Sequence, residues 1–169
     1  RITLKQRRRR RPCPNGWLVA ACVSSTFHRS SGAEPVKQPT HYFVTDIEAD
    51  GPDPAQNSML SFATVVVRED GEMCGEFEAV MSPRPDRSAD QRTMKWWEGQ
   101  PEAWAAATLD PVDPAQAMNR FADWVETYPE PRSFAARPVA FDGIWIDRYL
   151  RDFAGSYLLD IPYWGRNIF

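Results

Sequence analysis

The sequence predicts an α/β protein: a mixed sheet made of a three-stranded antiparallel meander and a parallel strand, flanked by helices. Three observations predict this class. Strand-like runs joined by turn residues fill positions 41–83, helix signals begin at residue 90, and the apolar run at 137–141 leads directly into an amphipathic segment. With 169 residues and 43% apolar side chains, the chain is long enough to bury one ordinary core.

The strands are predicted from β-branched and aromatic runs. HYFVT begins at His41, and SMLSFATVVV spans residues 58–67. Asp70-Gly71 is the turn dipeptide expected of a hairpin, so CGEFEAVMSP at 74–83 returns as a third strand. These three segments form the antiparallel meander.

The helices are predicted from capping residues and apolar spacing. DQRTMKWWEGQ starts at Asp90, and the Pro101 that follows it suits the first turn of a second helix, PEAWAAAT. Asp113 is the expected N-cap of a third helix, with Pro114 at its first position and Gln116 placed for a capping box.

A last strand and helix complete the predicted fold. RPVAF at 137–141 is a short apolar run and is interpreted as the fourth strand. It runs into DGIWIDRYLRDF at 142–153, where apolar residues recur at helical spacing. We therefore expect Asp142 at a strand-to-helix junction.

Charge divides the chain into two parts. Residues 1–40 hold nine Lys and Arg and one acid, whereas residues 41–169 hold 11 Lys and Arg against 22 Asp and Glu, a net charge of −11. So acidic a body is a poor general binder of duplex nucleic acid, which requires many cations at phosphates. We interpret 1–40 as a disordered basic leader and 41–169 as the folded domain.

Neither export nor membrane insertion is predicted. The apolar stretch WLVAACV at 17–23 is only seven residues long, too short for a membrane span. The three cysteines are odd in number and lack C-x-x-C spacing, and the two histidines match no metal-ligand pattern. We expect a reducing, cytoplasmic location.

Acidic residues end the most strand-like segment, in FVTDIEADGP at 43–52. Residues two apart on a strand point to the same side, so Asp46 and Glu48 aim their carboxylates at one spot. Unpaired carboxylates repel each other, and a divalent cation turns that repulsion into binding. If the fourth strand lies beside the first, Asp142 joins them. Hard oxygen ligands of this kind select Mg²⁺ or Mn²⁺ over zinc.

Two other interpretations of these acids stay open at this point. DIEADG matches the opening of a calcium-binding EF-hand loop, although position twelve is Asn57 instead of glutamate and the flanks resemble strands. EADGPDP also fits a polar turn rich in Asp, Gly and Pro. The further acid at a strand-to-helix junction, Asp142, favours the metal site.

The segments VTDIEADGP, SMLSFATVVV and PVAFDGIWIDRYL resemble the DEDD family of 3′-5′ exonucleases. That family includes the proofreading subunit of bacterial DNA polymerase III, ribonuclease T and oligoribonuclease, and it has a ribonuclease H-like fold. Its first motif, D-x-E-x-x-G, matches Asp46, Glu48 and Gly51. The core of its second motif, F-D, matches Phe141 and Asp142.

The resemblance covers residues 41 to about 155 and has departures. Ala49 and Asp50 stand where relatives often carry Thr or Ser. Asp147 competes with Asp142 for the second-motif position but lies further into the helix, so we interpret it as a surface or salt-bridge residue. The third motif, a His or Tyr four or five residues before a last Asp, has no counterpart. We therefore expect a sequence truncated at both ends, since YWGRNIF stops before the helix and strand that normally precede this motif.

The resemblance implies two-metal hydrolysis of phosphodiester bonds at the 3′ ends of single-stranded RNA or DNA. Asp46 would bridge both ions, Glu48 would hold the ion that activates water, and Asp142 would help position the ion at the leaving 3′-oxygen. Without the third motif we expect weak metal binding and little or no cleavage. The choice of RNA or DNA, the identity of the base and the formation of a homodimer, as in several relatives, stay open. A non-catalytic interaction module on the same fold is the alternative.

Six residues are predicted to contact the substrate: Ala49, Asp50, Gly51, Met59, Leu60 and Trp97. Met59 and Leu60 follow the first motif where relatives wedge the terminal base. Trp96 and Trp97 are adjacent on a helix, so one ring is expected in the core and the other exposed, and exposed rings stack bases at ~1–3 kcal/mol per base. The WW tract resembles one in exoribonucleases of this superfamily, which favours RNA. Core packing is the alternative role for these side chains.

Overall fold

A computed structural model describes residues 38–155 and 166–167 of the protein. Almost all of the described residues belong to one compact unit, Pro39–Phe169, and almost all of the predicted basic leader lies outside the described residues.

The predicted meander is confirmed. Strands β1 (His41–Ala49), β2 (Met59–Arg68) and β3 (Met73–Val80) pair antiparallel in sequence order. Gly71 lies in the β2–β3 turn with φ of 87°, a left-handed conformation that glycine adopts without strain. The full sheet has the order β3-β2-β1-β4-β5.

The helices between β3 and β4 begin at the predicted capping residues. They are α1 (Gln91–Trp97), α2 (Pro101–Thr108) and α3 (Pro114–Glu126). The Asp90 side chain accepts a hydrogen bond from Thr93 N, and the Asp113 side chain accepts from the main-chain N of Ala115 and Gln116. These carboxylates satisfy N–H groups that have no partner within a helix. Within the described part of the chain, no helix is long and apolar enough to cross a membrane.

The predicted position of the fourth strand is wrong. Strand β4 spans Arg132–Ala136, and the predicted strand residues from Val139 onward instead open helix α4 (Val139–Tyr149). Short apolar runs fit a strand and a helical turn equally well. The rings of Phe141, Trp145 and Tyr149 form a row along α4. The helical spacing of this row therefore begins at Phe141, within the predicted strand.

Two further elements complete the described chain. A five-residue π-helical turn, η1 (Leu150–Ala154), extends α4 and ends at Gly155, whose φ is 62°. Strand β5 (Arg166–Asn167) pairs parallel with β4. Strand β5 was not predicted, because YWGRNIF was expected to stop before any further strand.

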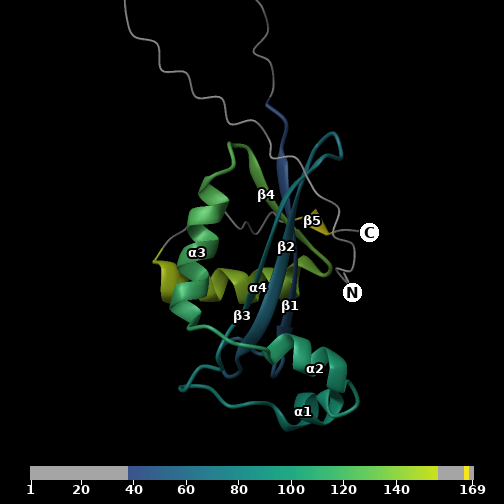
Figure 1. Ribbon diagram of the computed structural model, residues 1–169, viewed down its shortest axis with the longest axis vertical. Helices are drawn as coiled ribbons and strands as arrows, with labels where there is room; N and C mark the ends of the chain where they lie inside the picture. Colours follow the sequence, from purple (N-terminus) through teal and green to yellow (C-terminus); the bar gives the residue numbers. More distant parts are fainter. Residues whose placement is uncertain (1–37, 156–165, 168–169) are drawn as a thin grey trace, which may run out of the picture. The chain divides into compact units, whose positions relative to one another are not determined.

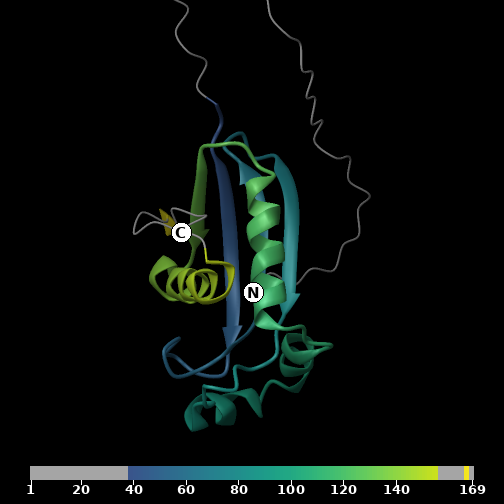
Figure 2. The same ribbon diagram turned by 90° about the vertical axis from the view of Figure 1, so that its left-hand side faces the viewer.

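The core lies between the sheet and helices α3 and α4, which cover the same face (Figures 1 and 2). Alternate residues of the strands meet both helices there, and the largest buried side chains include Phe43, Phe121, Phe134, Trp145 and Tyr149. Helices α1 and α2 lie together at the end of the sheet where β1 stops (Figure 1). This arrangement places α1, the end of β1 and the start of α4 around one region.

Candidate functional site

The C-terminal half of β1 carries the first two predicted acids. Strand alternation puts Thr45 and Ile47 in the protein interior, while Asp46 is exposed and Glu48 is half-buried on the opposite face. The β1–β2 register shifts between Glu48 and Ala49, which marks a β-bulge. Bulges of this kind occur next to active sites, where they redirect side chains.

Asp142 reaches the same region from the first turn of α4, not from the end of a strand. Its Oδ1 accepts a hydrogen bond from Ile47 N at 3.1 Å, and the residue is only 3% exposed. The β1–β4 ladder ends at the pair Val44–Ala135. Beyond that pair, the Asp142 carboxylate provides the acceptor that a continuing β4 would have offered to the Ile47 N–H.

The pKa of Asp142 is raised from 3.8 to about 6. Burial is the main cause, and the negative charge of Asp46 adds to it, while the hydrogen bond from Ile47 acts in the opposite direction. The interaction shows that Asp46 and Asp142 are electrostatic neighbours. A buried carboxylate beside a second carboxylate is an environment that a cation would stabilise.

The donor chemistry suits Mg²⁺ or Mn²⁺, since the three predicted ligands offer only carboxylate oxygens. The convergence is partial. Among residues 38–155 and 166–167, no three His, Cys, Asp or Glu side chains come together as a metal site. Asp46 and Asp142 interact, and Glu48 lines the adjoining pocket.

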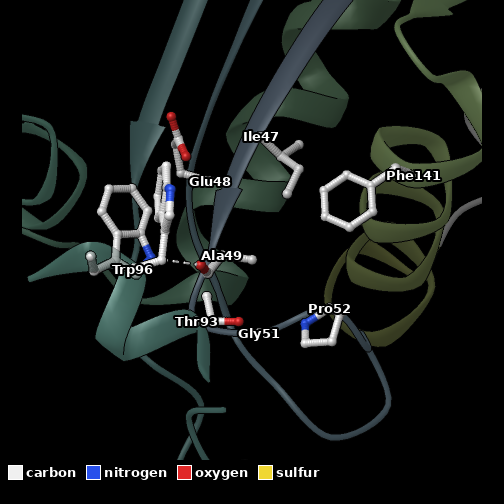
Figure 3. Close-up of a pocket in the computed structure, with 9 residues that line it drawn as sticks. Ile47, Glu48, Ala49, Gly51, Pro52, Thr93, Trp96 and Phe141 are labelled. Atoms are coloured by element: carbon white, nitrogen blue, oxygen red, sulfur yellow. Dashed lines mark hydrogen bonds between the residues drawn. The ribbon is translucent and has the colours of Figure 1, made fainter. Parts of the chain in front are cut away.

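That pocket lies between the end of β1, helix α1 and the start of α4. Figure 3 shows Trp96 and Phe141 on opposite sides of the end of β1. The lining residues are Ile47, Glu48, Ala49, Gly51, Pro52, Thr93, Trp96, Trp97 and Phe141. It therefore joins a carboxylate to exposed aromatic surface, and aromatic rings of this kind can stack nucleic-acid bases.

The two adjacent tryptophans divide as predicted, but Trp97 is the buried one. Trp97 is 3% exposed and its Nε1 donates to Ala49 O at 3.0 Å, whereas Trp96 is 50% exposed. Trp97 packs edge-on against both Trp96 and Trp104. The ring open to a stacking base is therefore that of Trp96, and Trp97 contributes only part of the pocket wall.

Three predicted substrate contacts lie elsewhere. Met59 and Leu60 are 0% and 1% exposed and belong to the protein interior. The Asp50 carboxylate is buried and accepts a hydrogen bond from Ser58 N at 2.6 Å, so it closes its own loop. Burial raises the pKa of Asp50. Ala49 and Gly51 do line the pocket.

The EF-hand interpretation is wrong. Strands β1 and β2 flank the acidic loop, where an EF-hand requires helices. The carboxylate of Asp53 accepts hydrogen bonds from Ala55 N and Gln56 Nε2, so it serves the turn itself. Asp147 forms an ion pair with Arg151 at 2.8 Å on the surface of α4, in agreement with its predicted role.

Five pocket residues were predicted neither as substrate contacts nor as metal ligands: Ile47, Pro52, Thr93, Trp96 and Phe141. Phe141 was identified only as part of the second motif, yet it is 39% exposed, unusual for so large an apolar side chain. Its position directly before Asp142 in the sequence could have indicated that it lies at the site. Thr93 could not be found from spacing, because it reaches the pocket only through the packing of α1.

Comparison with known proteins agrees with this geometry. Residues 40–167 match the family of 3′-5′ exoribonuclease Rv2179c-like domains. A search of curated protein sequences gave no significant match.

Solved structures of exonuclease I share the fold. One is Escherichia coli exonuclease I with a 5cy-dA13 oligonucleotide, at a TM-score of 0.57 and 15% identity over 76% of this chain and 27% of that one. Exonuclease I from Methylocaldum szegediense gives the same four values. A product-bound exonuclease I reaches a TM-score of 0.59 at 15% identity, covering 78% of this chain and 30% of that one. The chain thus spans less than a third of these proteins.

The fold and the family match confirm the predicted resemblance to DEDD-type 3′-5′ exonucleases with a ribonuclease H-like fold. The chain belongs to the family of Rv2179c-like 3′-5′ exoribonuclease domains.

Proposed function

We propose that this domain removes nucleotides from the 3′ end of single-stranded RNA by metal-dependent hydrolysis of phosphodiester bonds. The family description, which names exoribonucleases, favours RNA over DNA. Exonuclease I structures with bound dA13 and dT13 oligonucleotides support a single-stranded substrate. The net negative charge of residues 41–169 also favours a short single-stranded substrate, because binding of long duplexes needs an extended basic surface.

The hydrogen bond between Ile47 N and Asp142 Oδ1 is the observation that carries the proposal. It ties the start of α4 to the strand that bears Asp46 and Glu48, so Asp46 and Asp142, which are far apart in the sequence, meet at one end of the sheet. A pocket with aromatic walls adjoins them. Packing alone gives no reason to bury the Asp142 carboxylate beside the negative charge of Asp46.

Each residue has a distinct role in the proposed reaction. Asp46, Glu48 and Asp142 would hold Mg²⁺ or Mn²⁺, and the bound ions would supply an activated water and stabilise the departing 3′-oxygen. Trp96 and Phe141 bind and orient the terminal nucleotide through their exposed rings. Orientation of the scissile phosphate at the metal site that these carboxylates would form then lowers the barrier by proximity.

Metal binding is the direct test. We expect Mn²⁺ titration by calorimetry, with a short single-stranded RNA present, to detect binding to the full chain that Asp46→Asn removes. Asp147→Asn is the matched control, because it deletes a carboxylate of α4 that pairs with Arg151 on the surface. Shortening of 5′-labelled RNA from its 3′ end, which is expected to be slow without the third motif, should follow the same order. Equal Mn²⁺ binding by the wild type and Asp46→Asn would contradict the proposal.

One observation favours a second candidate, a non-catalytic module that binds nucleic acid on the same fold. No three-ligand metal cluster occurs in the part of the chain that the structure describes. This candidate predicts RNA binding that neither EDTA nor Asp46→Asn changes, without shortening of the RNA. The same titration and digestion therefore separate the two functions.

A further inference from the structure

The loop that joins β1 to β2, residues 50–58, is closed by its own ends. Asp50 N donates to Ser58 O at 3.0 Å, and Ser58 N donates to the Asp50 carboxylate at 2.6 Å. Gly51 and Pro52 in this loop form part of the pocket wall beside Glu48. The conformation of the loop therefore sets the shape of one side of the pocket.

Asn57 holds the interior of this loop. It is 6% exposed, and its Oδ1 accepts from Asp53 N at 3.0 Å while its Nδ2 donates to Ser88 O at 2.7 Å. Its main-chain N also donates to Asp53 O at 2.8 Å. The amide is thus bound at both ends, and one of its partners belongs to the segment that leads into α1.

Gly51 lies directly against this amide. A Cβ at position 51 would stand 2.1 Å from Asn57 Cγ and 2.5 Å from Nδ2, much closer than real Cβ atoms approach. The backbone of Gly51 does not have a positive φ, unlike that of Gly71 and Gly155. The glycine is therefore required here for space and not for a left-handed conformation.

The opposite wall of the pocket is tied to the same loop. Ser88 N donates to Gln56 O at 3.0 Å, and Asp90 N donates to Asp50 O at 2.8 Å. Asp90 is also the N-cap of α1, the helix that carries Trp96. The Asn57 amide consequently adds a side-chain link between the two walls.

We propose that Asn57 is a positioning residue for the nucleotide pocket and that Gly51 is needed because its missing side chain admits the Asn57 amide. Asn57 acts through the loop and α1 without touching the substrate. The role in substrate binding rests on the proposed function, whereas the packing of Gly51 on Asn57 does not.

Three variants test this inference: Gly51→Ala, Asn57→Ala and the double variant. Gly51→Ala should lower the melting temperature, because its Cβ overlaps a pinned amide. The double variant should melt above Gly51→Ala, because truncation at residue 57 removes the overlapping atoms. A double variant that melts no higher than Gly51→Ala, or a Gly51→Ala protein as stable as wild type, would overturn the packing argument.

RNA affinity tests the positioning role. Asn57→Ala should weaken binding of a 5′-labelled single-stranded RNA about tenfold and raise KM by a similar factor with little change in kcat, since misplaced walls lose contacts that hold the nucleotide equally in the ground state and the transition state. Asn119→Ala on α3 is the matched control, because it also loses two side-chain hydrogen bonds, to Ala115 O at 2.7 Å and Phe153 O at 3.2 Å. The control should melt at a lower temperature with unchanged RNA affinity.

The outcomes separate the two proposals. If the wild type binds and shortens RNA and Asn57→Ala keeps its affinity, the positioning role is wrong and the proposed function stands. If the wild type neither binds nor shortens RNA, the proposed function fails and the positioning role fails with it. The melting temperatures decide the packing of Gly51 against Asn57 in either case.

Discussion

The two halves of strand β1 differ in what surrounds them. From His41 to Val44 the strand pairs with both β2 and β4, and Phe43 contacts the rings of Trp124 and Tyr128. From Asp46 onward it pairs with β2 alone, and the side chain of Asp142 takes the place of β4. The first half has a paired strand on both sides, whereas the second half has one paired strand and carries acids that repel each other.

This difference separates, along one strand, the half that stabilises the fold from the half that carries the candidate site. Burial of apolar side chains stabilises the first half at roughly 25 cal/mol for each Å² removed from water. Beside the second half, the buried carboxylate of Asp142 in α4 opposes folding whenever it is ionised without a cation. Truncation of a buried apolar side chain should therefore lower stability, whereas neutralising Asp142 should raise it in the absence of a cation.

The largest effect is expected in the aromatic core. Phe121 is fully buried, with ring centroids 4.9 Å from Phe62 and 5.2 Å from Phe77. Phe121→Ala should lower the free energy of unfolding by about 3–5 kcal/mol, because it removes buried apolar surface and leaves a cavity. Urea denaturation followed by tryptophan fluorescence measures this. A loss below about 1 kcal/mol would contradict the view of this region as the main source of stability.

A smaller effect of opposite sign is expected at Asp142. In the presence of EDTA at pH 8, Asp142→Asn should unfold with a free energy about 2–3 kcal/mol higher than wild type. The asparagine Oδ1 still accepts the hydrogen bond from Ile47, but the buried charge beside Asp46 is gone.

The stability difference between wild type and Asp142→Asn should depend on pH. The pKa of Asp142 is about 6 in the folded protein and 3.8 as an ordinary carboxyl, so the folded state binds the proton more tightly. Wild-type stability relative to Asp142→Asn should therefore be greatest below pH 4, fall between pH 4 and 6, and stay constant above. A difference that is independent of pH would show that Asp142 does not titrate in this range.

The smallest effect is expected at the exposed ring of the pocket. Trp96→Ala should weaken binding of single-stranded RNA by about 1 kcal/mol, or about fivefold, because one stacking surface is lost. Stability should change little, since the ring is half exposed. Leu109→Ala removes another exposed apolar side chain, away from the pocket lining, and should leave RNA affinity unchanged. Equal affinities for wild type and Trp96→Ala would exclude stacking at this ring.

Sequence patterns predicted the parts of the fold that local chemistry decides. Turn residues and β-branched runs located the meander, and Asp90 and Asp113 located two helix starts. The run at 137–141 was misassigned because its apolar content fits either state, and only the pairing of Arg132–Ala136 with β1 decides between them.

The site was predictable to the extent that it follows from strand alternation. The two-residue spacing of Asp46 and Glu48 placed both on one face, as observed. Spacing could not show which of Trp96 and Trp97 is exposed, because that depends on the packing of Trp97 against Trp104 and on its bond to Ala49. Asn57 was noted only as the mismatch at position twelve of an EF-hand loop, since its contact with Gly51 appears only once the loop is folded.

The contact between Ile47 and Asp142 also has a consequence for folding during synthesis. The two residues are 95 positions apart, and contacts at such separation form late because long loops must close first. Ribosomes add about 5–20 residues per second, so Asp142 emerges roughly 5–20 s after Ile47. A nascent chain therefore carries no assembled set of these carboxylates until α4 has emerged and packed against β1.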